Sequence, residues 1–285
     1  MSSADTHDID YLLDEVITLP SLPTTVANLT ELVNDPACSL AMVGKVIGTD
    51  PALAIKSLRL VNSAYYGLRE KITSVEHAVV LLGPKVVKNL IFTAAVFDTL
   101  SEGEESLLRH SVSCGVVMRT LVDSGASKMR FAKPEESFVF GLLHDVGKII
   151  FQQFMPAEYG QVILTAETRG IPRVHAEREI LGVDHAELGA RLAVKWKLPD
   201  ELAGGINGHH DISRCPNEAH KGLAALLCIA DNICHASGFA GADDVAPPVP
   251  PEAWAITGLD GRAMIQVLDR FFESVKDIDE LVALA

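Results

Sequence analysis

Phe138-Val-Phe-Gly-Leu-Leu-His144-Asp145-Val-Gly-Lys148 is the stretch around which the rest of the chain is organised. Its adjacent histidine and aspartate lie within an otherwise apolar run that has the character of a helix. Burying an imidazole and a carboxylate costs several kcal/mol unless they are hydrogen-bonded, paired with an opposite charge or bound to a metal ion. His144 and Asp145 therefore indicate a polar site inside the protein core.

Further polar residues lie in similarly apolar helical surroundings. These are His110, His185, His209, His210 and Asp231. Taken singly, a histidine on an apolar face is more often hydrogen-bonded to a backbone carbonyl than bound to a metal, and the aspartate could cap a turn. Seven such groups would need seven separate explanations, whereas one inward-facing site explains them jointly. Imidazole and carboxylate together suit Fe, Mn, Zn or Ni.

The seven side chains suffice for two divalent metal ions about 3.5–4 Å apart, with Asp145 as the bridging ligand. The first ion would take His110, His144 and Asp231. The second ion would take His185, His209 and His210. Such a pair generates hydroxide near neutral pH and holds a phosphoryl oxygen. A buried hydrogen-bond network without metal is the alternative explanation of the same seven residues.

Lys148 follows His144 by about one helical turn and offers a cation for a phosphate group. A solvated lysine at the end of a helix explains the same residue equally well. Both interpretations stay open at the level of the sequence.

Composition and charge limit the class of protein. The chain has 285 residues, of which 48% are hydrophobic and only 6% aromatic, so it can bury a large core and favours helices over sheets. The formal net charge is −14, which argues against general nucleic-acid binding because that requires a positive surface.

Neither a disulfide scaffold nor a targeting segment is evident. The five cysteines are scattered without a C-x-x-C pair, which is typical of a reducing cytoplasm. The N-terminus carries no signal-peptide pattern, and no apolar run approaches the roughly 18 residues of a membrane span. We expect a soluble cytoplasmic protein with no membrane contact.

Helix caps and apolar stripes with helical spacing recur along the chain, without the alternation that marks strands. They predict an all-α fold. In the first third, helices are expected over about 40–47 and from Pro51, and a capping box at Thr73-x-x-Glu76 opens another. Asn62-Ser63 and residues 72–83 are expected to stabilise the junction between short helices rather than to form a catalytic site.

The second part of the chain is expected to deliver the polar residues from helices. Asp184-x-x-Glu187 is a capping box that places His185 at the first helical position, and Leu198-Pro199 opens the helix that ends at His209-His210. A Pro-rich linker at 245–251 precedes an amphipathic helix from about Gly261 to Val275.

The predicted organisation has four parts. They are an acidic N-terminal tail (1–15), an N-terminal lobe of five or six short helices (16–100), a second helical lobe (101–240) and a linker with a C-terminal helix (241–285).

Several motifs in a fixed order resemble a known family. They are Leu19-Pro-Ser-Leu-Pro, Asp50-Pro-Ala-Leu, Asn62-Ser-Ala-Tyr-Tyr-Gly, Ile72-Thr-Ser-Val-Glu-His-Ala-Val-Val-Leu-Leu-Gly83, Gly141-Leu-Leu-His-Asp-Val-Gly-Lys148, Glu179-Ile-Leu-Gly-Val-Asp-His-Ala-Glu-Leu-Gly189, Trp196-x-Leu-Pro199 and His209-His210. The order His…His-Asp…His…His-His…Asp resembles the HD superfamily of metal-dependent phosphohydrolases. The whole of roughly residues 15–235 is similar to HDOD, the HD-related output domain of bacterial signalling proteins.

The resemblance implies an N-terminal multi-helix lobe packed on an HD-type helical lobe. It also implies a regulatory signal-transduction module that is non-catalytic and acts through protein or nucleotide binding. No receiver, GGDEF or EAL module fits in the 285 residues, so signalling partners are expected to act in trans.

The alternative is a metal-dependent phosphohydrolase or phosphodiesterase acting on a nucleotide or cyclic dinucleotide. The related HD-GYP phosphodiesterases carry Gly-Tyr-Pro after the paired histidines, whereas this chain has Asp211-Ile-Ser-Arg-Cys-Pro216 there. The family resemblance favours the regulatory module, and the intact ligand set favours the hydrolase.

Overall fold

The computed structural model describes most of the chain from residue 38 onward. The described residues are 28–29, 32, 35, 38–47, 51–62, 72–84, 87, 91, 105–125, 134–196, 198–240 and 245–284. Every regular element within these ranges is a helix, with no strand among them, which confirms the all-α prediction. The acidic tail, the motif at 19–23 and the segment at 63–67 lie outside these residues.

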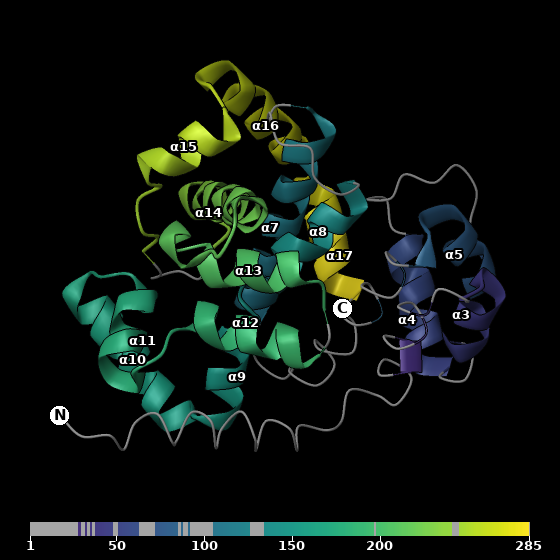
Figure 1. Ribbon diagram of the computed structural model, residues 1–285, viewed down its shortest axis with the longest axis horizontal. Coiled ribbons are helices and arrows are strands. Elements are labelled where there is room, and N and C mark those ends of the chain that lie inside the picture. The colour runs from purple at the N-terminus through teal and green to yellow at the C-terminus, as the bar shows by residue number, and fades with distance from the viewer. Residues whose placement is uncertain are drawn as a thin grey trace.

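Three short helices from the N-terminal third lie together at one end of the molecule (Figure 1). They are α3 (Leu40–Ile47), α4 (Pro51–Val61) and α5 (Val75–Leu82), and α3 and α4 both pack against α5. Val43, Ile47 and Val79 are fully buried among them. The helix α5 begins one residue later than the capping box predicted: Ser74, not Thr73, is the N-cap, and its side chain accepts from the His77 amide.

Asn62 joins two segments of this lobe, as the sequence predicted. Its side-chain amide donates to the Leu58 carbonyl at 2.8 Å and to the Ile72 carbonyl at 2.7 Å. Its side-chain oxygen accepts from the Ile72 amide at 2.7 Å. One side chain thus satisfies backbone groups at the end of α4 and in the segment that precedes α5, which would otherwise lack partners.

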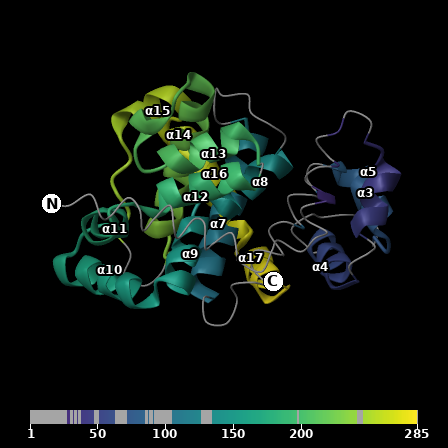
Figure 2. The same ribbon diagram turned by 60° about the horizontal axis from the view of Figure 1, so that its bottom comes forward.

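The larger part of the molecule is built on three helices in mutual contact (Figure 2). They are α7 (Glu105–Asp123), α8 (Pro134–Leu143) and α14 (Glu218–Ala236). The helices α7 and α8 approach closely because Gly141 has no side chain. A Cβ atom there would lie 2.5 Å from the Cys114 carbonyl oxygen.

A second set of helices covers this core on one side. The set comprises α9 (Val146–Phe154), α12 (His185–Lys195) and α13 (Asp200–Gly208). The helix α12 packs on both α9 and α13, and α13 packs on α14. A Cβ atom on Gly147 would collide with the His185 backbone carbonyl, so only glycine permits this contact between α9 and α12.

Two helices extend this part of the fold with a small core of their own. They are α10 (Pro156–Arg169) and α11 (Arg173–Leu181), which pack together. Phe151 of α9 stacks on Tyr159 of α10, with ring centroids 5.5 Å apart.

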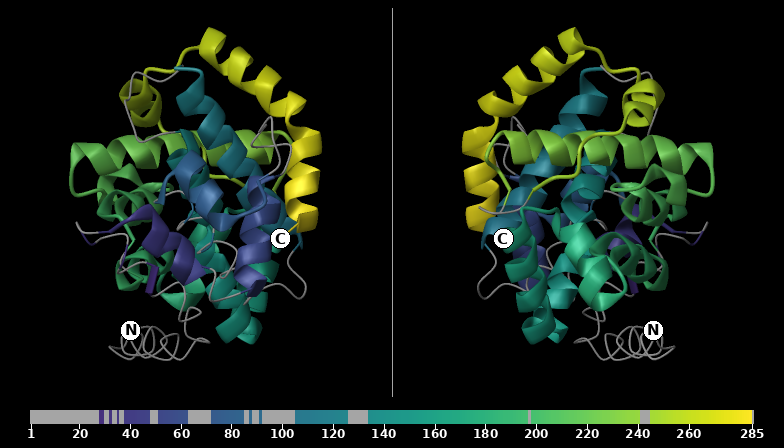
Figure 3. Two further views of the ribbon diagram at one scale, coloured as in Figure 1. Left: turned by 90° about the vertical axis from the view of Figure 1, so that its right-hand side faces the viewer. Right: turned by 90° about the vertical axis from the view of Figure 1, so that its left-hand side faces the viewer.

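Three helices follow the Pro-rich linker, where the sequence predicted one. They are α15 (Pro251–Thr257), α16 (Gly261–Glu273) and α17 (Val275–Leu284). The predicted helix corresponds to α16. It ends at Glu273 with Ser274 as its C-cap, and α17 then continues in a new direction along the side of the molecule (Figure 3). The helix α17 packs against both α7 and α4, so it touches both lobes.

The boundaries of the predicted tail, lobes and linker remain predictions.

None of the helices in the described ranges combines the length and the apolar character that a membrane crossing requires.

Candidate metal centre

His144 and Asp145 lie in a two-residue break between α8 and α9, not inside one continuous helix as the sequence predicted. Asp145 occupies the N-cap position of α9 with φ −98° and ψ 12°, yet its carboxylate caps nothing. A continuous helix would point neighbouring side chains about 100° apart. The break instead lets both residues face the same interior, where they are 0% and 1% exposed.

The other predicted ligands come from four different helices and reach the same place. His110 comes from the middle of α7, and Asp231 comes from α14. His185 is the first residue of α12, whose N-cap Asp184 accepts from the Glu187 amide as predicted. His209 and His210 follow the last turn of α13.

The first group consists of His110, His144 and Asp231. The Nε2 atom of His110 lies 3.3 Å from the Nε2 atom of His144 and 3.1 Å from Oδ1 of Asp231. Oδ2 of Asp145 lies 3.4 Å from each of the two Nε2 atoms.

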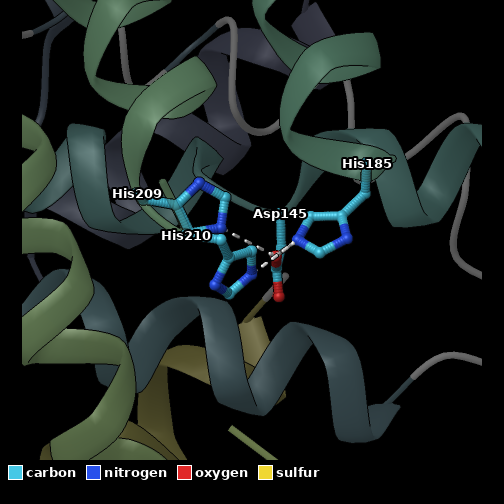
Figure 4. A group of neighbouring side chains, drawn as sticks. All are labelled: Asp145, His185, His209 and His210. Atoms are coloured by element: carbon cyan, nitrogen blue, oxygen red, sulfur yellow. Dashed lines mark hydrogen bonds and ion pairs between the residues drawn. The ribbon is translucent and has the colours of Figure 1, made fainter. Parts of the chain in front are cut away.

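The second group consists of Asp145, His185, His209 and His210, drawn in Figure 4. Oδ1 of Asp145 lies 3.2 Å from Nε2 of His185 and 3.9 Å from Nε2 of His209. Nε2 of His185 lies 3.0 Å from Nε2 of His210. Asp145 therefore turns one carboxylate oxygen to each group, which is the placement that a bridging ligand needs.

The outer nitrogens of the histidines fix the ring orientations. The Nδ1 atoms of His144 and His209 lie 2.6 Å from the carbonyl oxygens of Gly141 and Ile206. A carbonyl only accepts, so Nδ1 carries the proton, and in a neutral ring Nε2 is left with a lone pair. These lone pairs converge on the interior, as metal ligands do.

Several inward atoms have no well-aligned hydrogen bond, although they lie at ion-pair distance from their neighbours. They are Oδ1 and Oδ2 of Asp145, Oδ1 of Asp231 and Nε2 of His209. Buried acceptors are costly to leave unmatched. A divalent cation in each group would satisfy these acceptors at once, so the donor set fits a pair of metal ions.

Protons occupy part of this site when no metal is bound. Burial lowers the pKa of His110, but the neighbouring carboxylates of Asp145 and Asp231 outweigh burial and raise that pKa to about 10. Burial also lowers the pKa of His144, and the Asp145 charge outweighs it to give a pKa of about 10. Burial and the charges of neighbouring histidines lower the pKa of His209 to about 3. Metal binding must therefore displace protons.

Lys148 is 5% exposed, which excludes the solvated-lysine interpretation. Its Nζ atom lies 2.9 Å from Oδ2 of Asp145. Burial raises the pKa of Asp145, but the charges of His144 and Lys148 outweigh burial and hold that pKa well below its usual range. The lysine is thus placed beside the shared carboxylate, and its contact with a phosphate remains a prediction.

Glu177 of α11 supports His185 and was missed by the sequence reasoning. Its Oε2 atom accepts from the His185 amide at 2.8 Å and lies 2.6 Å from Nδ1 of the ring. Its Oε1 atom accepts from the Tyr159 hydroxyl at 3.2 Å. Burial lowers the pKa of His185, but the charge of Glu177 outweighs burial and raises that pKa to about 10. No sequence signal pointed to Glu177, because α11 itself was not predicted.

Two residues that follow the last predicted ligand, Asp231, in the chain also contact the first group. Nε2 of His235 lies 3.3 Å from Oδ1 of Asp231, one helical turn earlier on α14. Spacing of four residues from Asp231 could have indicated it. The carbonyl oxygen of Phe239 lies 3.1 Å from Nδ1 of His110. A backbone contact of this kind leaves no trace in residue identity.

The fold and the motifs have counterparts among known proteins. The HDOD domain model matches residues 19–212. The crystal structure of a candidate phosphohydrolase from Shewanella amazonensis SB2B is 26% identical, with a TM-score of 0.73, and the match covers 96% of this chain and 97% of that one. An HDOD domain protein of unknown function from Geobacter sulfurreducens is 25% identical, with a TM-score of 0.76 and 99% of each chain covered.

A curated relative is larger than this chain. An uncharacterized protein of Treponema pallidum (strain Nichols) is 26% identical over 223 residues, which are 77% of this chain and 43% of that protein. The chain thus spans less than half the length of this curated relative.

Proposed function

This chain belongs to the HDOD domain family, and from that premise we propose that it is a regulatory signal-transduction module whose conformation depends on a pair of divalent metal ions. The ions would be held by the two groups that share Asp145. Fe, Mn, Zn and Ni all suit such a set of imidazoles and carboxylates. The module would act through binding of bacterial signalling proteins in trans or of a nucleotide.

The burial of the ligands carries this proposal. Within the described residues, the most exposed of His110, His144, Asp145, His185, His209 and Asp231 shows 2% of its surface. Only His210 among the seven is more than marginally accessible. Closed coordination is typical of structural metal sites, whereas catalytic sites keep an open position for water or substrate. The geometry therefore favours a metal that holds α7, α9, α12, α13 and α14 in one arrangement.

A metal-dependent phosphohydrolase is the second candidate, and two observations support it. Asp145 turns its two oxygens to the two groups, as in dinuclear hydrolases, and Lys148 lies beside it. A bound metal pair would supply an activated water and stabilise negative charge on a phosphoryl group. Lys148 would contact a phosphate oxygen, and Glu177 would keep His185 in its tautomer. A substrate must also enter, so this function requires an opening near His210.

Elemental analysis together with a substrate panel tests both functions. Protein is purified without chelator, supplied with Fe, Mn, Zn and Ni in separate samples, and assayed on phosphomonoesters, phosphodiesters, nucleotides and cyclic dinucleotides. We expect up to two ions per chain in the wild type and loss of most metal in Asp145→Ala. Asp269→Ala is the matched control, because Asp269 lies exposed on α16.

The outcomes separate the two candidates. Metal binding without turnover supports the regulatory module. Turnover that disappears in Asp145→Ala but persists in Asp269→Ala supports the hydrolase instead. A wild type that takes up none of the four metals overturns the metal-dependent part of both.

A further inference from the structure

The histidines of the centre differ in how their outer nitrogens are held. His144 and His209 each use a carbonyl three residues earlier in the chain. His185 uses Glu177, eight residues earlier. His110 uses the carbonyl of Phe239, which lies 129 residues later. Its orientation is therefore set by tertiary structure, and not by its own helix.

Phe239 is fixed by contacts from three directions. It follows α14 through Gly238, whose φ of 78° suits glycine, and its amide donates to the Cys234 carbonyl at 2.8 Å. Its ring meets the ring of Phe271 from α16 edge to face, with centroids 5.1 Å apart. The guanidinium of Arg109 lies over the same ring, 5.2 Å from its centre. Both ring contacts stabilise this position of Phe239.

Arg109 connects this ring to the C-terminal helix. Its Nη1 atom lies 2.5 Å from Oδ1 of Asp279 on α17. The helix α17 packs against α7, which carries Arg109 and His110, and also against α4 of the N-terminal lobe. A continuous set of contacts thus runs from α4 through α17, Arg109 and Phe239 to His110. Figure 2 shows α17 between α4 and α7.

We propose that Phe239 is a positioning residue for His110, and that the C-terminal helices α16 and α17 thereby set the metal affinity of the first group. The inference rests on the proposed metal centre and deepens it by naming its regulation. Residues 239, 271 and 279 lie beyond the region matched by the family model, which ends at residue 212. The second group lacks these contacts among the described residues, so α16 and α17 would act on one ion of the pair.

The expected loss of metal affinity follows from what orienting partners contribute to other metal-bound histidines. Loss of a partner that orients a metal-bound histidine typically weakens metal binding about 10- to 100-fold. Replacing the Phe239 ring leaves its carbonyl in the chain but removes the two ring contacts that hold it. We therefore expect the first group to weaken about tenfold in Phe239→Ala, while the second group keeps its affinity.

Calorimetric titration with Mn²⁺ of metal-free full-length protein tests this inference. His144→Ala and His210→Ala assign the two binding steps to the first and second groups. Phe239→Ala should weaken only the step that His144→Ala abolishes. Phe239→Tyr keeps an aromatic ring and should retain wild-type affinity, whereas a general loss of packing in Phe239→Ala would weaken both steps.

Two exposed ion pairs of the C-terminal helices provide a milder pair of variants. Asp279→Asn removes the partner of Arg109 and should weaken the first step by up to about fivefold. Arg270→Gln breaks the ion pair of α16 with Asp123, which does not involve Phe239, and should leave both steps unchanged. Both replaced side chains are more than half exposed, so these variants stay informative if Phe239→Ala does not fold.

The outcomes distinguish this inference from the metal centre itself. Equal weakening of both steps in Phe239→Ala, or an effect of Arg270→Gln as large as that of Asp279→Asn, overturns the inference and leaves the centre standing. Two unchanged steps in both Phe239→Ala and Asp279→Asn do the same. A wild type that binds no metal ion overturns both.

Discussion

The two halves of the candidate metal centre are assembled in different ways. The second group draws three of its ligands from residues 185–210, where two short helices and their caps position them. The first group draws its ligands from α7, the break after α8, and α14, which are separated by up to 121 residues from His110 to Asp231. One half thus depends on local sequence, and the other on the packing of distant helices.

This difference predicts which changes affect which half. A substitution at a local cap or close approach should act on the second group, whereas a change in the distant C-terminal helices should act on the first. The following predictions test this division, starting with the largest expected effect.

Gly147→Ala should disrupt the second group most severely. Its Cβ atom would collide with the His185 carbonyl, a backbone atom that cannot move without shifting α12. Overpacking of this kind costs roughly 1–3 kcal/mol or more. We expect a loss of at least about 3 kcal/mol in the free energy of unfolding, measured by urea denaturation.

Gly160→Ala is the matched control within α10, where a Cβ atom meets nothing within 4 Å. It should be neutral or stabilise by about 0.5–1 kcal/mol, since alanine favours a helix over glycine. Equal unfolding free energies for the two variants would contradict the close approach of α9 and α12.

Glu177→Gln should weaken the second group while sparing the first. The amide replaces a charged acceptor that holds both the backbone and Nδ1 of His185. We expect a 10- to 100-fold loss of affinity in one of two metal-binding steps, observed by calorimetry. Tyr159→Phe removes only the 3.2 Å hydrogen bond to the other oxygen of Glu177 and should have a smaller effect on the same step. Weakening of the step that belongs to His110 would refute the division.

Asn62→Ala should lower stability without changing either half of the centre. It removes two hydrogen bonds to Ile72 and one to the Leu58 carbonyl of α4. A loss of about 1–2 kcal/mol is expected, visible as a lower Tm in calorimetry. Metal content should equal that of the wild type. An unchanged Tm with lost metal would show that this junction serves the site.

Asp184→Asn should have the smallest effect, and one that depends on pH. Asparagine can still cap α12, but it loses the ion pairs with Arg178 at 2.5 Å and Arg214 at 3.0 Å. Burial raises the pKa of Asp184, but the charge of His185, the Glu187 amide and the two arginines outweigh it and lower that pKa.

The sign of this pH effect follows from the lowered pKa. The carboxylate stabilises the folded state above its ordinary pKa, near 4, and this stabilisation is lost as pH falls through the lower folded value. The unfolding free energy of the wild type should exceed that of Asp184→Asn by about 1 kcal/mol at pH 7, and this difference should vanish below pH 4. Unfolding free energies measured across this range would contradict the prediction if the gap widened on acidification.

Much of the second group could be predicted from the sequence because its signals are local. The Asp184 cap was read correctly, since an N-cap is a relation between residues three positions apart. The shift of the α5 cap from Thr73 to Ser74 shows the limit of such reading, because two adjacent hydroxyl residues compete for one position. The break at His144–Asp145 was missed because its flanking residues are apolar and suit a continuous helix.

The support of the first group could not be predicted in the same way. Asp231 was found only because it shares a helical stripe with apolar residues. The carbonyl of Phe239 contributes to the site through the backbone, which every residue possesses, so its role depends on α16, Arg109 and the turn at Gly238. Nor did the sequence indicate α17, which begins directly after α16 ends.

The burial of the ligands also bears on how long a bound metal ion would stay in the protein. An ion in the first group would be enclosed by side chains that expose 2% of their surface or less, and it could not exchange while the helices stay in place. Its escape requires local opening of the protein, a process with its own free energy and rate. The lifetime of this ion would then be set by the separation of α7 and α14, and a stronger or more concentrated chelator would not shorten it. Such a centre retains its metal through brief changes in the supply around it.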